Sequence, residues 1–379
     1  MAGIYLHIPL CKQACYYCDF HFSTFFGLKQ DLIAAMISEI ALRKDYLGHE
    51  DVDTVYFGGG TPSILDKGEL ARLLDAIYEN HKVSDDAEIT IEANPDDLKR
   101  QKAKDLADLG FNRLSIGVQS FDNDTLSYLN RAHSSEESFL AIRNVVEAGF
   151  LNLNLDLIFS IQEGRLEILK KDVNHMLQLR PAHISAYSLT IEKRTVFGNW
   201  LEKGKIDKVS DDQAANEYEY IVEALTGAGY LHYEVSNFAM PGFISRHNSS
   251  YWKQVPYLGI GPSAHSFNAR SRQVNINNNS RYIQAIKKGN IPAAEEVLSR
   301  ADSINEILLT GLRTQWGADL SLIRNRFGVD LESYYKSYIQ DLVKLNLATF
   351  NDGKIQLSKK GMLIADKISS DLFFIDKND

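Results

Sequence analysis

Three cysteines lie close together near the start of the chain, at Cys11, Cys15 and Cys18, and the sequence contains no others. Thiolates this close can bind one metal centre, and the C-x3-C-x2-C spacing fits three corners of an iron-sulfur cube. A 4Fe-4S cluster with three protein ligands keeps one iron free, and that iron can chelate the amino and carboxylate groups of a small molecule. The alternative is a zinc site that borrows His7 or His21, but structural zinc usually has two separated ligand pairs, and the sequence has no second pair.

Short apolar runs alternate with longer helical patterns through the first half of the chain. The runs predict strands over residues 3–9, 52–57, 88–93, 113–119, 153–159 and 183–189. Helical periodicity follows the first five of them, over residues 28–46, 67–81, 97–109, 135–149 and 166–179. Successive strand-helix units imply a parallel sheet with right-handed crossovers. The sequence therefore predicts an α/β fold in the form of an open, partial (β/α)6 barrel.

Polar residues follow or close these predicted strands. They include the cysteine loop, the run from Gly58 to Thr61, and the side chains of Glu92, Gln119 and Asp156. In such folds the chemistry gathers where the carboxyl ends of the strands meet their loops. A carboxylate inside an apolar strand, such as Asp156, is costly to bury unless something pairs with it. We therefore expect these residues to face one mouth of the barrel and to hold a ligand.

The composition limits the partners that the chain can have. It has 379 residues with 41 basic and 50 acidic side chains, which give a formal charge of -9. Such a chain lacks the excess of positive charge that binds a nucleic-acid backbone. The sequence has no apolar run as long as a membrane span, and residues 1–10 lack the pattern of a signal peptide. Three cysteines fit a reducing compartment. We expect a cytoplasmic protein that contacts no nucleic acid and has no integral membrane segment.

The end of the chain predicts a separate module. Helical patterns near residues 303–314, 319–326 and 331–345 precede a hairpin around residues 351–353 and a last helix. That order is typical of a winged helix. Residues 299–379 contain 11 Lys or Arg and 11 Asp or Glu, which favours a lid or docking role over DNA binding. The expected parts are the barrel at 1–230, a β-containing extension at 231–298, and a C-terminal winged-helix-like domain at 299–379.

Residues 11–18, CKQACYYC, resemble the signature of the radical S-adenosylmethionine (SAM) superfamily. The resemblance implies that Cys11, Cys15 and Cys18 hold a 4Fe-4S cluster whose open iron binds SAM. It also implies reductive cleavage of SAM to methionine and a 5'-deoxyadenosyl radical. In that superfamily an aromatic residue before the third cysteine packs on the adenine, which here would be Tyr17. The glycine triplet at 58–60 resembles the loop that lies against the amino group of SAM.

Longer motifs resemble the oxygen-independent coproporphyrinogen III oxidase group of this superfamily. They lie at residues 5–9, 19–20, 58–62, 92–95 and 115–120. The likeness implies that the following residues line SAM sites: Tyr5, Gly59, Gly60, Thr61, Glu92, Gln119, Arg131 and Asp156. Simpler roles are open for single members, since Tyr5 could belong to the core, Arg131 could be a solvated charge at a helix end, and Gln119 could cap a strand.

The chain departs at two places from the pattern that is usual in the branch of this group with an H-N-x-x-Y-W motif. Asn130 stands before Arg131 where glycine is usual, and the residues at 160–162 read Ser-Ile-Gln instead of Gly-Leu-Pro. Phe20 occupies the position of the fourth cysteine of the true oxidases, and their N-terminal extension does not precede the first predicted strand. These last two features favour a branch of the group other than the oxidases.

The segment HNSSYW at residues 247–252 resembles the H-N-x-x-Y-W motif of the haem chaperones of the HemW family, and residues 233–238 and 258–266 are also similar to that family. The resemblance implies a protein that binds haem and passes it to acceptor proteins. His247 would be the axial ligand of the haem iron, with Tyr251 and Trp252 packed beside the porphyrin.

We expect the motif to lie in a polar, flexible loop, and other assignments of its histidine stay open. His247 could instead hydrogen-bond within an ordinary loop, and His7, His21 and His265 are rival ligands. Two other functions also stay open: an oxygen-independent coproporphyrinogen III oxidase, and a radical SAM enzyme that acts on another substrate.

Overall fold

The computed structural model describes residues 1–48 and 50–376, and most of them surround one curved sheet of twelve strands. The strand order is β12-β11-β10-β9-β1-β2-β3-β4-β5-β6-β8-β7. The middle six strands are parallel: β1 (Ala2–Ile8), β2 (Val52–Gly59), β3 (Val83–Ala93), β4 (Arg113–Gln119), β5 (Asn152–Phe159) and β6 (His183–Ser188). The predicted partial (β/α)6 barrel is therefore confirmed, with additional strands at both edges.

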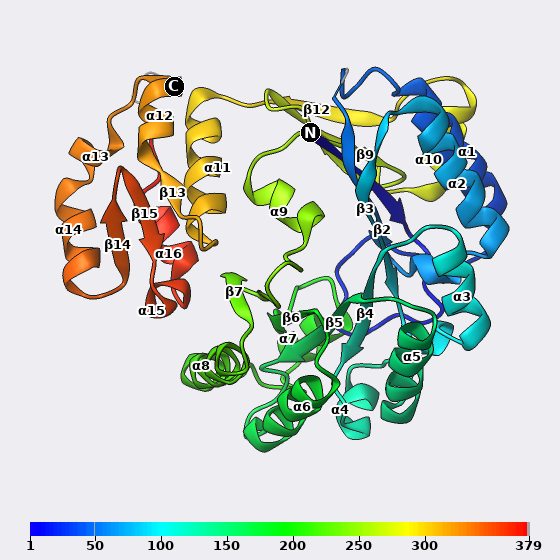
Figure 1. Cartoon of the computed structure of the whole chain (residues 1–379), viewed down its shortest axis with the longest axis horizontal. Helices are drawn as coiled ribbons and strands as arrows, with labels where there is room; N and C mark the ends of the chain where they lie inside the picture. The colour runs from blue at the N-terminus through cyan, green and yellow to red at the C-terminus, as the bar shows by residue number, and fades with distance from the viewer. Residues whose placement is uncertain (49, 377–379) are drawn as a thin grey trace.

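Helices cover the outer face of this sheet (Figure 1). They are α1 (Lys29–Leu42), α2 (Lys67–Asn80), α3 (Arg100–Asp108), α4 (Asn123–Tyr128), α5 (Ser135–Glu147) and α6 (Leu166–Leu179). Two of them begin with a capping box, in which Asp66 pairs with Glu69 and Ser134 with Glu137. In the part of the chain that the structure describes, none of the helices is both long and apolar enough to cross a membrane.

The barrel strands have one apolar face and one polar face. On β4, Leu114, Ile116 and Val118 are buried in the core. The alternate residues of the same strand line a cavity inside the barrel: Arg113, Ser115, Gly117 and Gln119. Strands that are buried on both faces are normally apolar throughout. The polar inner stripe therefore points to the lumen as a place where a ligand binds.

Residues 196–298 widen the sheet at both edges. The elements are α7 (Val196–Glu202), α8 (Asp211–Gly227), β7 (Leu231–Glu234), β8 (Asn237–Ala239), α9 (Arg246–Trp252), β9 (Tyr257–Ile260), β10 (His265–Phe267), β11 (Ser271–Asn275), α10 (Asn279–Lys287) and β12 (Ala293–Val297). Strand β8 pairs antiparallel with β6, and β9 pairs parallel with β1. Phe238, Leu258 and Tyr282 belong to the same hydrophobic core as Ile4 of β1. Residues 231–298 thus pack as part of the barrel.

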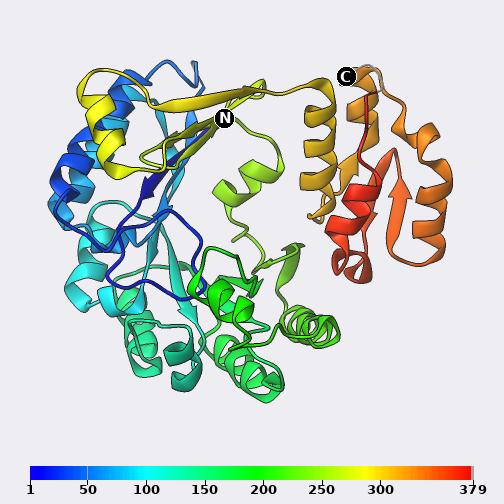
Figure 2. The same cartoon turned by 180° about the vertical axis from the view of Figure 1, so that it is seen from behind.

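The C-terminal domain has a hydrophobic core of its own, which includes Ile304, Ile323 and Leu342. Its elements are α11 (Arg300–Leu312), β13 (Ala318–Asp319), α12 (Leu320–Phe327), α13 (Leu331–Tyr334), α14 (Lys336–Lys344), β14 (Ala348–Asn351), β15 (Lys354–Leu357), α15 (Lys359–Met362) and α16 (Ala365–Asp371). The order of helices and strands up to the β14–β15 hairpin is that of a winged helix. The helix expected over 331–345 is divided into α13 and α14. Figure 2 shows the domain standing beside α9, across from the barrel.

Candidate functional site

A cavity of about 530 Å³ lies inside the barrel and reaches the loops at the carboxyl ends of its strands. Eleven of the residues predicted to bind the cluster or SAM line it: Cys11, Cys15, Tyr17, Cys18, Gly59, Gly60, Thr61, Glu92, Gln119, Arg131 and Asp156. Tyr5 does not line this cavity. Its ring stacks on Tyr56 with the ring centroids 6.0 Å apart, so Tyr5 supports the cavity wall from behind.

The cysteines lie on the long loop between β1 and α1. The backbone N–H of Cys11 donates to the carbonyl of Ser23, and the hydroxyl of Thr61 lies 3.5 Å from the Cys11 thiol. Burial raises the pKa of the Cys11 thiol, and it raises the pKa of the Cys18 thiol to about 11. A metal must displace these protons, because the thiolate is the form of cysteine that binds iron.

The two histidines that could complete a zinc site have other partners. Nε2 of His7 lies 2.9 Å from the carbonyl oxygen of His21, and Nε2 of His21 lies 2.8 Å from Oδ1 of Asn279. Among residues 1–48 and 50–376, no three His, Cys, Asp or Glu side chains are placed to hold a single metal ion.

Arg131 lies beneath the cysteine loop and makes several hydrogen bonds there. Its guanidinium donates to the Cys15 thiol over 3.3 Å, to Oδ1 of Asn94 over 2.6 Å, and to the carbonyl of Gly117 over 2.9 Å. The alternative of a solvated charge at a helix end is therefore wrong. The guanidinium thus places positive charge beside the Cys15 thiol.

The two departures from the family pattern lie at residues with left-handed backbone. Asn130 has a φ of 56° and Ser160 has a φ of 56°, a region that glycine adopts most easily and asparagine tolerates. The amide of Asn130 also donates to the carbonyl of Ala14 over 2.7 Å. The asparagine thus keeps the required turn and ties it to the cysteine loop.

Close packing explains part of the glycine run after β2. A Cβ atom at Gly60 would lie 2.7 Å from the carbonyl oxygens of Ile8 and Leu10. A Cβ atom at Gly59 would lie 2.6 Å from the ring of His7, and Gly59 also has a φ of 105°. These two glycines are therefore needed for the approach of β2 to the strand that leads into the cysteine loop.

Two half-buried carboxyl groups face the cavity from β3 and β5. Glu92 accepts hydrogen bonds from the hydroxyl of Tyr56 over 2.8 Å and from the backbone N–H of Gly59 over 3.1 Å. Burial raises the pKa of Glu92 to about 7 and the pKa of Asp156 to about 6, although hydrogen bonds to each carboxylate oppose the rise. Buried carboxyls that titrate near neutral pH inside a cavity are typical of functional sites.

The HNSSYW motif forms helix α9 and not the flexible loop that we expected. The hydroxyl of Ser245 caps the helix by accepting the N–H of Asn248. The His247 side chain is only 2% exposed. Its Nδ1 lies 2.8 Å from Oγ1 of Thr54, and its Nε2 lies 2.9 Å from the hydroxyl of Tyr251. Burial lowers the pKa of His247 to about 3, so the ring is neutral.

Helix α9 closes the end of the lumen opposite to the cysteines. Glu88 on β3 accepts the backbone N–H groups of Arg246 and His247 over 3.0 and 2.9 Å, and Asn248 lines the cavity. At the other end of the helix, the guanidinium of Arg313 lies 5.6 Å from the centre of the Trp252 ring. The motif therefore joins the barrel to the C-terminal domain.

Comparisons with known proteins agree with this architecture. The Radical SAM superfamily matches residues 5–169, and the HemN C-terminal domain matches residues 298–364. A protein of Lactococcus lactis subsp. lactis with the name heme chaperone HemW is 37% identical over 377 residues, which are 99% of this chain and 98% of that protein. The chain belongs to the HemW family.

A second HemW, from Bacillus subtilis, is 34% identical over 373 residues, which cover 97% of this chain and 98% of that protein. The solved structure of coproporphyrinogen III oxidase (HemN) from Escherichia coli, a radical SAM enzyme, has a TM-score of 0.84 and covers 98% of this chain and 90% of its own. Its identity is 24%, so that likeness describes the fold alone. The resemblance to the HemW family noted in the motifs is thereby confirmed.

In this HemW family member, several cavity residues were missed by reasoning from the sequence. They are Tyr56, Asn94, Arg113, Ser115, Asn154 and Ser185. Arg113 is 1% exposed, and its guanidinium nitrogens have no hydrogen-bond partner within the described residues. Polar residues at every second position, as at 113, 115, 117 and 119, were the signal that could have revealed this inner face.

Proposed function

We propose that this protein is a haem chaperone that carries a 4Fe-4S cluster on Cys11, Cys15 and Cys18, binds SAM, and passes haem to acceptor proteins. The observation that carries the proposal is the similarity, over nearly the whole chain, to proteins named heme chaperone HemW. The position of the three thiols in the same cavity as eight further residues predicted for a radical SAM site supports it.

The cavity residues supply what SAM needs from the protein. A bound cluster would supply an open iron for the amino and carboxylate groups of SAM, and an electron for its cleavage. Glu92 and Asp156 can accept hydrogen bonds from the N–H and O–H groups of SAM. Tyr17 can cover the adenine, because its ring lines the cavity directly before Cys18. The glycine run has no side chains at 58–60 to keep a ligand away from the backbone.

The haem part of the proposal uses helix α9. His247 is the proposed axial ligand, and Tyr251 and Trp252 are the proposed packing partners. Because both ring nitrogens of His247 have partners, ligation requires that Tyr251 releases Nε2 or that Thr54 releases Nδ1. The aromatic side chains next to His247 on the same helix would then be free to cover the porphyrin. The rival ligands are the exposed His265, the half-buried His21 and the buried His7.

The proposal places the protein in the cytoplasm, with haem and haem-accepting proteins as its partners. Three unpaired cysteines fit a reducing compartment. The balance of 41 basic and 50 acidic residues speaks against a nucleic-acid partner.

The test is anaerobic reconstitution of the cluster, followed by haem titration and an assay of coproporphyrinogen III decarboxylation. We expect haem to bind with a distinct Soret band and no protoporphyrinogen IX to form, because Phe20 stands in place of a fourth cysteine. Formation of protoporphyrinogen IX would replace the proposal with the oxidase alternative. Cleavage of SAM without haem binding would favour a radical enzyme that acts on another substrate.

A further inference from the structure

The amide of Asn154 on β5 holds the carboxylate of Asp156. Its Nδ2 donates to Oδ1 of Asp156 over 2.7 Å and to the hydroxyl oxygen of Ser115 over 2.7 Å. Since both donors of the amide face acceptors on this side, its Oδ1 must accept from the other side. That oxygen lies 2.6 Å from Nδ1 of His183 and 3.1 Å from the hydroxyl of Ser185.

A first path leads from Asn154 to β7 through His183. Nδ1 of His183 must carry the proton that Asn154 accepts, so Nε2 is bare and accepts from the Tyr233 hydroxyl over 2.7 Å. Burial lowers the pKa of His183 well below its ordinary value, which keeps the ring neutral. Both His183 and Tyr233 are fully buried. Each hydrogen bond of this path therefore has one direction only.

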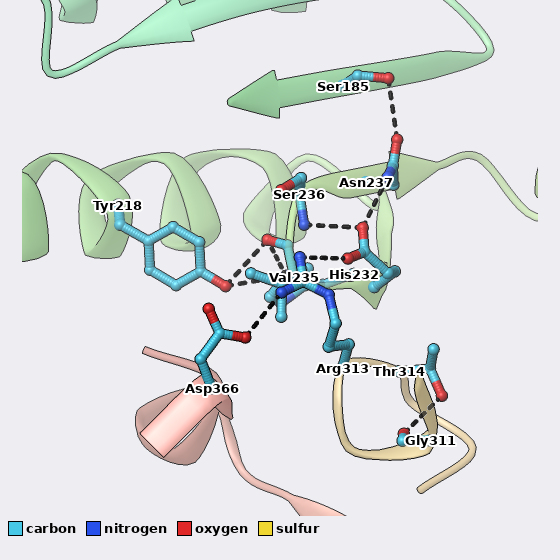
Figure 3. A network of polar contacts seen from close by, with 11 residues as sticks. Ser185, Tyr218, His232, Val235, Ser236, Asn237, Gly311, Arg313, Thr314 and Asp366 are labelled. Atoms are coloured by element: carbon cyan, nitrogen blue, oxygen red, sulfur yellow. Dashed lines mark hydrogen bonds and ion pairs between the residues drawn. The ribbon is translucent and has the colours of Figure 1, made fainter. Parts of the chain in front are cut away.

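A second path leads from Asn154 to the C-terminal domain. The hydroxyl of Ser185 has one proton, which it can donate to Oδ1 of Asn154 or to Oδ1 of Asn237 at 2.9 Å, so the two amide oxygens compete for it. Nδ2 of Asn237 donates to Oε2 of Glu234 over 2.6 Å. Oε1 of Glu234 accepts from the guanidinium of Arg313 over 3.1 Å. Arg313 also pairs with the exposed carboxylate of Asp366 at 3.0 Å (Figure 3).

Arg313 is fixed to the barrel by its backbone as well. Its carbonyl accepts the N–H of Val235 over 3.0 Å, and the N–H of Gln315 donates to the carbonyl of Tyr233 over 2.9 Å. Glu234 is 1% exposed, so its charge depends on Arg313 and on the amide of Asn237 for compensation. The C-terminal domain therefore supplies a cation that the polar network of the barrel needs.

We propose that Asn154, His183 and Glu234 are positioning residues for the Asp156 carboxylate, and that Arg313 makes SAM binding depend on the docked C-terminal domain. The inference rests on the proposed function, because it takes Asp156 to be a SAM contact. The physical reason is that a carboxylate held at Oδ1 by a fixed amide presents Oδ2 in one orientation, and pre-orientation of this kind strengthens binding.

The first experiment measures the dissociation constant of SAM for the reconstituted holoprotein. Tyr233→Phe and Ser185→Ala each remove one hydroxyl from one path, and Tyr230→Phe is the matched control because its buried hydroxyl bonds only the carbonyl of Pro181, outside both paths. We expect each path variant to weaken SAM binding by about 3- to 10-fold, the range that one hydrogen bond supports. The control should stay within about 2-fold of wild type. Because both paths end on one amide oxygen, the double variant should weaken binding by less than the product of the two single effects.

The second readout is the pH dependence of SAM binding, which a loss of packing alone would not shift. The donation from Asn154 helps to keep Asp156 ionised. If Asn154 is held less firmly in the path variants, Asp156 should take up a proton at a higher pH. SAM binding should then be lost at a higher pH in these variants than in wild type, and at an unchanged pH in Tyr230→Phe. The other charged or titratable groups whose fields reach Asp156 are Glu92, Arg113, Tyr56 and Tyr187 on the surrounding strands. None of these groups is itself substituted. Ser185→Ala also removes a hydroxyl that bonds Asp156 and Tyr187 directly, so Tyr233→Phe is the variant that tests positioning through Asn154 alone.

The third experiment tests the contribution of the C-terminal domain with Arg313→Met, Arg313→Lys and the control Asp366→Asn. We expect Arg313→Met to weaken SAM binding and to show the same pH shift. Arg313→Lys should keep part of the lost affinity, and Asp366→Asn should bind SAM as wild type does. Iron content and melting temperature are recorded for each variant. If wild type binds no SAM, or Asp156→Asn binds it normally, the proposed function of this site fails. If Asp156→Asn is impaired while Tyr233→Phe, Ser185→Ala and Arg313→Met bind normally, the positioning role is overturned.

Discussion

The imidazole of His247 stacks on the phenol ring of Tyr56, with the ring centroids 4.8 Å apart and the planes inclined by 23°. The hydroxyl of the same tyrosine donates to Glu92 in the cavity. One side chain therefore contacts both the helix of the HNSSYW motif and a carboxylate of the proposed SAM site. Movement of α9 would remove one face of the packing that holds Tyr56 against Glu92.

Each cysteine of the loop should be required for the cluster. Reconstituted wild type is expected to hold four irons and four sulfides per chain, and SAM should perturb its EPR spectrum. Cys11→Ala, Cys15→Ala and Cys18→Ala should each lose the cluster, while Thr24→Ala, an exposed position on the same loop, should keep it. One zinc per chain without uptake of iron would contradict the assignment.

SAM binding should weaken in mild acid. Glu92 and Asp156 have pKa values of about 7 and about 6, and a protonated carboxyl loses acceptor sites. Affinity measured between pH 8 and pH 5.5 should therefore fall as the pH drops through these values, at constant iron content. A flat profile over this range would show that neither carboxylate needs its charge to bind SAM.

Ionisation of Glu92 should favour SAM binding but should lower the stability of the cluster-free protein. The pKa of Glu92 is higher in the folded chain than its ordinary value of 4.5, so the folded state binds the proton more tightly than the unfolded state. Glu92 therefore lowers the free energy of unfolding as the pH rises from about 4.5 to 7. Urea unfolding of Glu92→Gln should reveal a variant that gains stability relative to wild type over this window, by about 1 kcal/mol or more at pH 8. A difference that does not change with pH would contradict this account.

Variants of α9 should separate its structural role from its role in haem binding. His247→Ala should lower the free energy of unfolding by about 2 kcal/mol, because it leaves Thr54 and Tyr251 without a buried partner. It should also abolish the Soret signal of ligated haem. Tyr251→Phe keeps the ring and frees Nε2 of His247, so haem should bind at least as tightly as in wild type. If His265→Ala loses the signal and His247→Ala keeps it, His247 is not the ligand.

Asn130 should prove important for its backbone and for its amide separately. Asn130→Ala places a methyl group at a φ of 56° and should unfold about 1 kcal/mol more easily than Asn130→Gly, which fits that backbone. Both variants lack the bond to Ala14, so both should release iron to a chelator faster than wild type. Equal unfolding free energies of the two variants would argue against strain at this position.

Elements with a clear apolar pattern could be predicted from the sequence to the residue. The strand over 113–119 and the helix over 166–179 have the predicted bounds. Strand β3 begins at Val83, five residues before the predicted start. Ser84, Asp85 and Asp86 are polar and not buried, so no apolar pattern marks this end of the strand. Local pattern therefore predicts the buried centre of a strand better than its exposed end.

Tertiary contacts explain why the structure of the HNSSYW motif could not be predicted. Asn248, Ser249 and Ser250 favour turns, so the local sequence indicates a loop. His247 packs against Thr54 and Tyr56, which are far from it in the sequence, and this packing stabilises the segment as a helix. The spacing of four residues between His247 and Tyr251 was the one local sign of that helix. The residues of the Asn154 network were missed for a similar reason, because their partners come from four different strands.

The two edges of the sheet are protected from other chains in different ways. Strand β12 ends one edge with the exposed charges of Glu295 and Glu296, which discourage the addition of a further strand. Strand β7 ends the other edge, where Glu234 forms a β-bridge with Thr314 of the C-terminal domain. A barrel deprived of that domain would present unpaired backbone groups at β7 and a buried carboxylate without its cation. Such a fragment would tend to self-associate, so the C-terminal domain also protects this edge of the sheet from pairing with other chains.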